Sequence, residues 1–425
     1  MPFSTLGLHD RLLRGVRELG FQRPTPIQQD ALPPALAGRD VLASAVTGSG
    51  KTAAFALPIL QRLAERPGGT TRALVLTPTR ELAAQIGDHL RAIGRYTRVT
   101  TTSVFGGTSL GAQERAFRRG VDVVVATPGR LLDHMRMPYA RLQGLEILVI
   151  DEADRMLDMG FLPDIRRILE RLPPARQTLL YSATLPPPIV ALSRTFLRDP
   201  AMISVTRPQA TATGLRQAAY PVPAGLKSAL LAELVRRGEV RSVIAFTRTK
   251  HRANRLADFL LRNGIAAGRI HGNRSQAQRT QALSGFKAGS FKVLVATDIA
   301  ARGIDVHALS HVVSFDVPAS PADYVHRVGR TARAAATGDA LLFVSPEEET
   351  DVRGIESALG QRLPRRTLDG FDYAAASARG LELRPRWQAR PPRAVRPRAS
   401  RTAARGAARG PARHRRRAAA ASVGR

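Results

Sequence analysis

Short β-rich apolar runs alternate with helical stretches along most of the 425 residues, and this alternation constrains the fold more than any other feature. A strand, a helix and a second strand in succession form parallel pairs, so the pattern predicts an α/β protein with parallel sheets. In the first half of the chain we expect helices at 80–93 and 111–119, and strands at 40–44, 73–77, 100–104, 122–126, 147–150, 178–181 and 202–205.

The alternation lapses at 206–214, a polar stretch containing proline and glycine that is typical of an interdomain linker. A second series of predicted strands follows at 242–246, 266–270, 292–296, 311–315 and 340–344. We therefore predict one domain over 1–205, a linker over 206–214, a second domain over 215–365 and a tail over 366–425.

A phosphate-binding loop is predicted at 45–52, with the sequence Ala-Val-Thr-Gly-Ser-Gly-Lys-Thr. It follows a predicted strand and opens a helix, which is the context in which such a loop cradles phosphates. The backbone N–H groups of Thr47, Gly48, Ser49 and Gly50 are expected to face the phosphate oxygens. Lys51 would reach the outer phosphates, and the Thr52 hydroxyl would ligate magnesium.

A second chemical signal is the apolar run 148–150, which ends in Asp151, Glu152 and Asp154. Carboxylates at a second strand end complete the metal site of many nucleotide triphosphatases. Asp151 is expected to hold Mg²⁺ and Glu152 to orient the attacking water. The alternative is an acidic helix N-terminus, which the helix dipole also favours.

The net charge of +31 is placed unevenly. Residues 384–425 contain 14 arginines and neither an acidic residue nor a lysine. This composition predicts a disordered tail, and it favours a polyanionic partner such as nucleic acid. The alternatives are a merely solubilising tail and an arginine content that reflects genomic base composition.

The chain has no cysteine, which excludes disulfides and thiolate metal sites. The N-terminus lacks the pattern of a secretory signal, and no uncharged apolar run is long enough to span a bilayer. We expect a cytoplasmic protein without a membrane partner.

The chain resembles the DEAD-box family of ATP-dependent RNA helicases over nearly all of residues 3 to 345. The resemblance rests on many short motifs in family order. They are 20–28, 45–52, 78–82, 106–107, 127–130, 151–154, 182–184, 246–249, His271-Gly272 with Gln276 and Arg279, 296–305 and 324–333. It implies two tandem RecA-like α/β domains with parallel sheets and a disordered basic C-terminal tail. Length and tail resemble the bacterial RhlE-like subgroup.

For the nucleotide, the resemblance implies ATP with Mg²⁺. Gln28 would read the adenine edge through its amide, which offers both a donor and an acceptor. The other expected base and ribose contacts are Phe3, Phe21, Arg23, Gly303 and Asp305. Arg327 and Arg330, three residues apart on one predicted helix face, would supply positive charge to the γ-phosphate. Ser182, Thr184, Asp154 and His326 would couple the carboxylate site to domain closure.

For RNA, the resemblance implies contacts to the sugar-phosphate backbone with little sequence specificity. The expected contacts in the first half are Pro78, Thr79, Arg80, Gly107, Thr127, Pro128 and Arg130. Those in the second half are Arg248, Arg274 and Thr297. Ribosome-assembly and RNA-decay proteins are both compatible partners.

In isolation, several of these residues have simpler readings. Gln28 could be a helix-surface glutamine, the two arginines a solvated basic face, and Ser182 and Thr184 ordinary hydroxyls. Val46 stands where the family usually has glutamine, and Ala332 where it often has glycine. The function predicted is RNA-stimulated ATP hydrolysis coupled to local unwinding or remodelling of short duplexes and RNA–protein complexes. An ATP-gated RNA clamp and a DNA translocase remain the alternatives.

Overall fold

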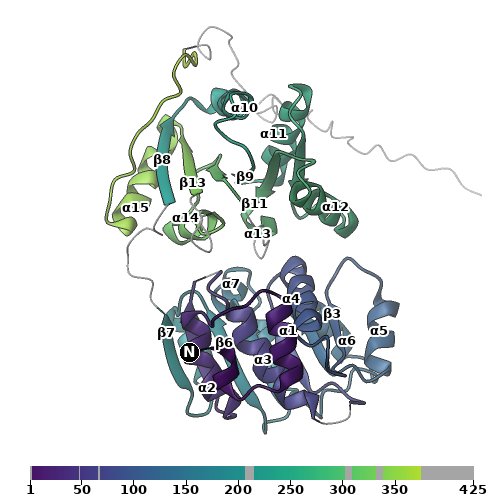
Figure 1. Cartoon of the computed structure of the whole chain (residues 1–425). Helices are drawn as coiled ribbons and strands as arrows, with labels where there is room; N and C mark the ends of the chain where they lie inside the picture. Colours follow the sequence, from purple (N-terminus) through teal and green to yellow (C-terminus); the bar gives the residue numbers. More distant parts are fainter. Residues whose placement is uncertain are drawn as a thin grey trace, which may run out of the picture. The chain divides into compact units, whose positions relative to one another are not determined.

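The computed structural model describes residues 2–46, 48–65, 68–205, 215–301, 309–331 and 338–374. The chain divides into a unit of residues 1–379 and a C-terminal segment from residue 380, and that segment lies outside the described residues. The larger unit contains two parallel sheets, and the α/β half built on each is described by itself (Figure 1).

The first half is built on a seven-stranded parallel sheet in the order β3-β4-β2-β5-β6-β1-β7. Its strands are β1 Val41–Ala45, β2 Ala73–Leu76, β3 Thr101–Val104, β4 Val123–Ala126, β5 Ile147–Asp151, β6 Gln177–Ser182 and β7 Ala201–Val205. Its helices are η1 Phe3–Leu6, α1 Asp10–Glu18, α2 Pro26–Leu36, α3 Lys51–Ala64, α4 Arg80–Ile93, α5 Leu110–Arg118, α6 Pro128–Met135, α7 Ala153–Asp158, α8 Leu162–Leu169 and α9 Pro187–Ser193.

Helices cover both faces of this sheet, so successive strand residues feed two separate cores (Figure 1). In β2, Ala73 and Val75 pack into one core, while Leu74 and Leu76 pack into the other. Strands buried on both faces read as continuous apolar runs, which is why the sequence pattern located them well.

The second half has a six-stranded parallel sheet in the order β10-β11-β9-β12-β13-β8. Its strands are β8 Leu215–Pro221, β9 Val243–Thr247, β10 Ala267–Ile270, β11 Val293–Thr297, β12 His311–Ser314 and β13 Gly338–Val344. Its helices are η2 Ala224–Leu226, α10 Lys227–Arg236, α11 Lys250–Arg262, α12 Gln276–Lys287, α13 Asp298–Ala301, α14 Pro321–Val328, η3 Pro346–Glu348 and α15 Glu349–Leu359. Helices again lie on both faces of the sheet (Figure 1).

Every strand predicted from the sequence is present within two residues at each end, and the parallel α/β fold is confirmed. One strand was missed: β8 follows directly after the predicted linker and pairs with β13 at the sheet edge. The linker 206–214 and residues 375–425 of the predicted tail lie outside the described residues. The predicted start of the tail at 366 is wrong, because residues up to 374 pack on the second half and Leu368 is buried in its core. The other domain boundaries stay predictions. No helix in the described part of the chain is long and apolar enough to cross a membrane.

Because every pairing in both sheets is parallel, the carboxyl ends of the strands share one edge of each sheet. In open α/β sheets this edge is where ligands bind. Many of the predicted site residues follow strand ends, so the fold gathers them along these two edges, whereas Phe3, Phe21, Arg23 and Gln28 come before β1.

Candidate nucleotide and RNA sites

The phosphate loop connects β1 to α3, and glycine gives it its shape. Gly48 and Gly50 have positive φ angles of 82° and 101°, which side-chain-bearing residues adopt at a cost. The Lys51 ammonium donates to the Ala45 carbonyl at 2.8 Å, so it is folded back over the loop and 7% exposed. Ser49 Oγ donates to the Val46 carbonyl at 2.8 Å. Thr47 lies outside the described residues.

Asp151 is the last residue of β5, Glu152 and Asp154 come directly after it, and all three are buried. Glu152 has φ 53° and ψ 52°, a left-handed conformation that is strained for a non-glycine residue. Its N–H donates to Asp151 Oδ1 at 3.0 Å, and its carboxylate lies 3.6 Å from the Arg155 guanidinium. Strain of this kind concentrates at functional sites, where the surrounding structure holds it.

The strand β6 lies between β5 and β1 and brings the loop and the carboxylates together. Ser182, at the end of β6, is level with Ser44 of β1, and its Oγ accepts the Asp154 N–H at 3.0 Å. The Asp154 carboxylate accepts from the Thr184 N–H at 2.8 Å and from the Thr184 hydroxyl at 2.9 Å. The predicted coupling residues of the first half are therefore in direct contact.

Two of these carboxylates have opposite electrostatic environments. Burial raises the pKa of Asp151, and Glu152 adds to the rise, while the Lys51 ammonium opposes it. Burial also acts to raise the pKa of Asp154, but the hydrogen bonds from Thr184 and Ser182 outweigh it, so that pKa lies below its usual value. Asp154 is thus held as a fixed structural anion, whereas Asp151 needs a cation to stabilise its charge.

Among the described residues, no group of three or more histidine, cysteine, aspartate or glutamate side chains could hold a metal ion by itself. Mg²⁺ retains several waters and binds through one or two protein ligands together with substrate phosphates. Asp151 and the half-buried Thr52 hydroxyl at the start of α3 fit this pattern.

Gln28 is buried at the start of α2 and contacts the phosphate loop directly. Its Nε2 donates to the Gly50 carbonyl at 2.9 Å, and its Oε1 accepts the Thr25 N–H at 3.0 Å. A Cβ at position 50 would lie 2.5 Å from Gln28 Nε2, so only glycine fits there. The second amide proton and the second oxygen lone pair keep the donor–acceptor pair that adenine reading requires.

The two aromatic residues predicted near the base pack on each other. Phe3 is 5% exposed, and its ring stacks on that of Phe21 with the centroids 6.4 Å apart. Arg23 is exposed. Stacking of Phe3 on adenine stays a prediction.

The predicted RNA contacts of the first half converge at the ends of β3, β4 and β2. Gly107 has φ 81°, and a Cβ there would lie 2.1 Å from Arg80 Nη1. A Cβ at Gly106 would lie 3.8 Å from Arg130 Nη2, and Arg130 Nη1 donates to the Thr108 carbonyl at 3.2 Å. Two guanidinium groups therefore flank bare backbone, which suits close approach of a sugar-phosphate chain.

The helix starts at these strand ends also carry predicted contacts. Thr79 precedes α4, and its hydroxyl accepts the Leu82 N–H at 3.3 Å. Pro78 lies beside it, and Thr127 and Pro128 occupy the corresponding place at the start of α6. Helix N-termini present free N–H groups that bind phosphate.

A neutral network that the sequence did not reveal supports this surface. Gln113 Nε2 donates to the Phe105 carbonyl at 3.0 Å and to Thr108 Oγ1 at 2.7 Å. Gln113 Oε1 lies 2.9 Å from His134 Nε2, and Tyr139 Oη lies 3.0 Å from His134 Nδ1. Because Oε1 is only an acceptor, Nε2 carries the proton and the tyrosine donates to Nδ1. Burial lowers the pKa of His134, which keeps this tautomer neutral.

The second half repeats the arrangement at the ends of β10, β11 and β9. Thr297 ends β11 and is level with Thr247 of β9, so Arg248 follows the neighbouring strand. Arg274 lies in the turn after β10, where its N–H donates to the His271 carbonyl at 3.0 Å. The structure thus places these three predicted contacts after three adjacent strands.

The prediction that Arg327 and Arg330 lie on one helix is wrong, but the two side chains do line the same pocket. Helix α14 ends at Val328, and Arg330 follows the C-cap Gly329. Arg327 is 2% exposed, and its guanidinium donates to both oxygens of Asp298 at 2.6 and 2.8 Å and to the Asp316 carbonyl at 2.6 Å. This guanidinium is committed to its own half of the protein.

The remaining predicted residues are placed as follows. His326 is half-buried on α14. Gly303 and Asp305, with Ala332, lie outside the described residues. Asp298 and Asp316, which hold Arg327, were not singled out from the sequence, although Asp316 follows an apolar strand just as Asp151 does.

The fold and these strand-end residues define a two-part α/β nucleoside triphosphatase, and the comparisons specify the class further. The DEAD/DEAH box helicase model matches residues 25–192, and the helicase conserved C-terminal domain model matches 226–335. The chain belongs to the DEAD-box ATP-dependent RNA helicase family.

Similar proteins include DEAD-box ATP-dependent RNA helicase CshA of Bacillus cereus, 42% identical over 88% of this chain and 71% of that protein. RNA helicase CrhR of Synechocystis is 44% identical over 85% of this chain and 73% of that protein. The S. cerevisiae Dbp5 structure bound to RNA and ADP BeF3 has a TM-score of 0.79 and 32% identity, covering 87% of this chain and 96% of that one. Mss116 bound to ssRNA and UDP-BeF has a TM-score of 0.80 and 27% identity, covering 88% and 81%. The RhlE-like subgroup stays a prediction.

Proposed function

We propose that this chain couples ATP·Mg hydrolysis on its first half to local remodelling of RNA bound along the strand ends of both halves. The observation that carries the proposal is the division of the first sheet edge. The ends of β5, β6 and β1 hold Lys51 and the carboxylates, while the ends of β3, β4 and β2 hold the Arg80–Gly107–Arg130 surface. One sheet thus offers adjacent places for nucleotide and RNA.

At the nucleotide end, Lys51 and the N–H groups of the loop bind the phosphates. Thr52 and Asp151 hold Mg²⁺, whose charge offsets that of the phosphates and stabilises ionised Asp151. Glu152 orients the attacking water. We assign the charge-stabilising role to Arg327 and Arg330, whose side chains line one pocket together with Asp298.

At the RNA end, the arginines and glycines bind phosphates without reading bases, so we expect little sequence preference. The 2′-hydroxyl would distinguish RNA from DNA. Closure of the halves on ATP and RNA would bend one RNA strand and separate a short duplex. Hydrolysis would then release the bound RNA. Duplex release, ribosome assembly and RNA decay are all compatible with this chemistry.

The proposal predicts that Lys51→Ala and Glu152→Gln abolish RNA-stimulated ATP hydrolysis, because the first removes phosphate charge stabilisation and the second removes the water-orienting carboxylate. Turnover is measured with and without single-stranded RNA. Glu170→Gln, a change on an exposed side chain at the end of α8, is the matched control and is expected to turn over like the wild type.

A duplex-release assay separates the helicase from the clamp. With ATP, we expect repeated release of strands from a short RNA duplex. With a non-hydrolysable analogue, we expect a single round of strand release. An enzyme that hydrolyses ATP but never releases a strand would support the clamp, and undiminished turnover in either variant would overturn the site.

A further inference from the structure

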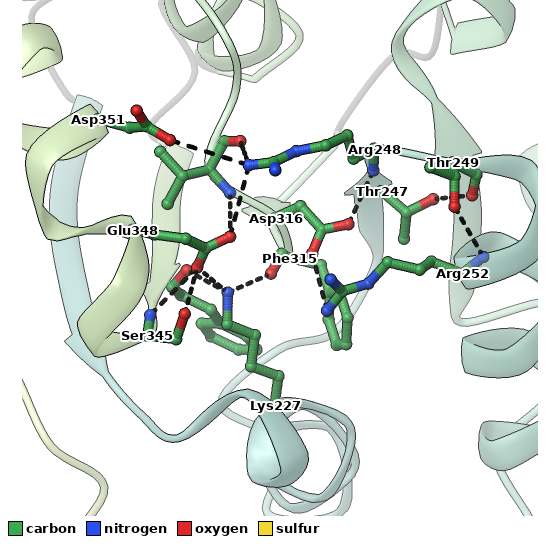
Figure 2. A network of polar contacts seen from close by, with 12 residues as sticks. Lys227, Thr247, Arg248, Thr249, Arg252, Phe315, Asp316, Ser345, Glu348 and Asp351 are labelled. Carbon is green, nitrogen blue, oxygen red and sulfur yellow. Dashed lines mark hydrogen bonds and ion pairs between the residues drawn. The ribbon is translucent and has the colours of Figure 1, made fainter. Parts of the chain in front are cut away.

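Arg248, the RNA-facing residue at the end of β9, rests on a buried carboxylate. The Asp316 side chain is fully buried two residues after β12, the strand that pairs with β9. Its Oδ2 accepts the Arg248 main-chain N–H at 2.8 Å, and its Oδ1 lies 3.0 Å from the Arg252 guanidinium (Figure 2). A single carboxylate thereby fixes the backbone of the loop and the first turn of α11.

A second ion pair, between Lys227 and Glu348, lies close to the Asp316–Arg252 pair. Lys227, at the start of α10, donates to the Phe315 and Phe343 carbonyls at 3.0 Å each and to the Glu348 carboxylate (Figure 2). Glu348 also accepts from Ser345, through its N–H at 3.1 Å and its hydroxyl at 3.0 Å. The pair joins the ends of β12 and β13 to η3.

This second pair also reaches Arg248. The Arg248 guanidinium donates to the Val317 carbonyl at 3.1 Å and lies 3.7 Å from Glu348 and 4.0 Å from Asp351. Its side chain remains 53% exposed. The backbone of Arg248 is therefore fixed by Asp316, while its side chain is directed by Glu348 and still meets solvent.

Asp316 has a third connection through its own main chain. Its carbonyl accepts from Arg327 Nη1 at 2.6 Å, and Arg327 in turn holds Asp298 beside Thr297. Asp316 therefore contacts both Arg248, in the loop after β9, and Arg327, on α14. Buried ion pairs contribute little net stability over apolar side chains of similar size, but they fix direction, which apolar contacts do not.

We propose that Asp316, supported by the Lys227–Glu348 pair, is a positioning residue that holds Arg248 ready for an RNA phosphate and links it to Arg327. The inference rests on the proposed role of Arg248 in RNA binding. A competing explanation gives Asp316 only the task of neutralising Arg252. On that account, removing the carboxylate adds local positive charge and strengthens RNA binding.

The test measures the affinity of the full chain for a fluorescein-labelled single-stranded oligo-uridine, with a non-hydrolysable ATP analogue, over a series of salt concentrations. Arg248→Ala is expected to weaken binding about tenfold by removing a charge-assisted contact. It should also reduce the slope of log affinity against log salt by about 0.7, the value of one phosphate contact on a single strand.

Asp316→Leu, which keeps the branching of aspartate but has no acceptors, is expected to reproduce both changes and to add nothing in the Arg248→Ala background. Asp316→Asn keeps an acceptor for the Arg248 N–H and is expected to recover most of the affinity. A loss of stability alone would reduce the active fraction without changing the salt slope. Asp339→Asn, which breaks the 2.8 Å ion pair with Arg216 at the other end of β13, is the matched control and should change neither quantity.

Additive effects of Asp316→Leu and Arg248→Ala, or tighter binding by Asp316→Leu, would overturn the positioning role. Unchanged binding by Arg248→Ala would instead overturn the RNA contact on which the inference rests. If Asp316→Leu does not fold, Glu348→Gln carries the test. The Glu348→Gln variant keeps acceptors for Ser345. The loss of RNA affinity that it causes is expected to be smaller, and this loss must likewise disappear in the Arg248→Ala background.

Discussion

The proposed RNA-facing surfaces of the two halves have the same topology but are supported by opposite chemistry. In the first half, a neutral chain of Gln113, His134 and Tyr139 holds the glycine loop. In the second half, charged Lys227, Glu348 and Asp316 hold the loop at Arg248. Gln113 and His134 in the first support, and Lys227 and Asp316 in the second, are buried.

The difference teaches how each support can fail. A neutral network loses hydrogen bonds when one member is removed, and it responds to pH only where it contains histidine. A charged network leaves an unpaired buried ion, which costs more. We therefore expect the support in the second half to be more sensitive to mutation and the support in the first half to be more sensitive to pH.

The largest expected effect is that of Lys227→Met. Removing this cation leaves Glu348, whose side chain is 13% exposed, with only the half-exposed Arg248 guanidinium at 3.7 Å, and it frees two strand-end carbonyls. We expect a cost of about 3–5 kcal/mol. The readout is hydrogen exchange of β12 and β13 in the full chain, which should accelerate strongly while β2 and β4 stay protected.

The matched control is Arg216→Met, because Arg216 pairs with Asp339 through a side chain that is 74% exposed. We expect no measurable change in exchange there, since solvent screens such pairs. Equal protection of β12 and β13 in Lys227→Met and wild type would show that the charged support contributes no stability.

A smaller effect is expected from pH through His134. Burial holds its folded-state pKa below the ordinary value of 6.5, so the unfolded chain takes up a proton first as pH falls. The contribution of the neutral His134 ring to the free energy of unfolding is therefore fully present above about pH 6.5. It decreases as the pH falls below that value, by at most about 1.4 kcal/mol per pH unit. The nearby charges are Arg130, Asp133 and Glu114, of which the arginine lowers the pKa further.

The measurement compares thermal midpoints of wild type and His134→Gln at pH 7.5 and 5.5. Because glutamine does not titrate, the difference in thermal midpoint between the two proteins should be smaller at the lower pH. His311, whose pKa burial also lowers, titrates in both proteins and cancels. A gap that stays constant with pH would mean that His134 is not the titrating group.

The strands, the phosphate loop and the carboxylates were predictable because local sequence decides them. Strands buried on both faces appear in the sequence as apolar runs. Gly48, Gly50 and Lys51 stand in a pattern that is typical of a phosphate-binding loop. The strand β8 was missed because it lies at the sheet edge and directly follows a linker-like stretch, so its polar residues carry no apolar signal.

The supports under the RNA surfaces were not predictable, because they join residues far apart in the chain. Lys227 reads as an ordinary helix-start cation until the fold brings it to Glu348, and Gln113 meets His134 only through helix packing. The error over Arg327 and Arg330 has a local origin, since their spacing placed both on one helix while α14 ends at Val328. Asp316 did carry a signal, an acid after an apolar strand.

The most direct test of the account compares Arg80→Gln, Arg248→Gln and the double variant, by the salt dependence of RNA affinity with a non-hydrolysable ATP analogue bound. If both halves hold the RNA backbone through separate supports, each single change should reduce the salt slope by about 0.7 and the double change by about 1.4. A slope that changes in only one of the two single variants would contradict the claim that RNA binds along the strand ends of both sheets.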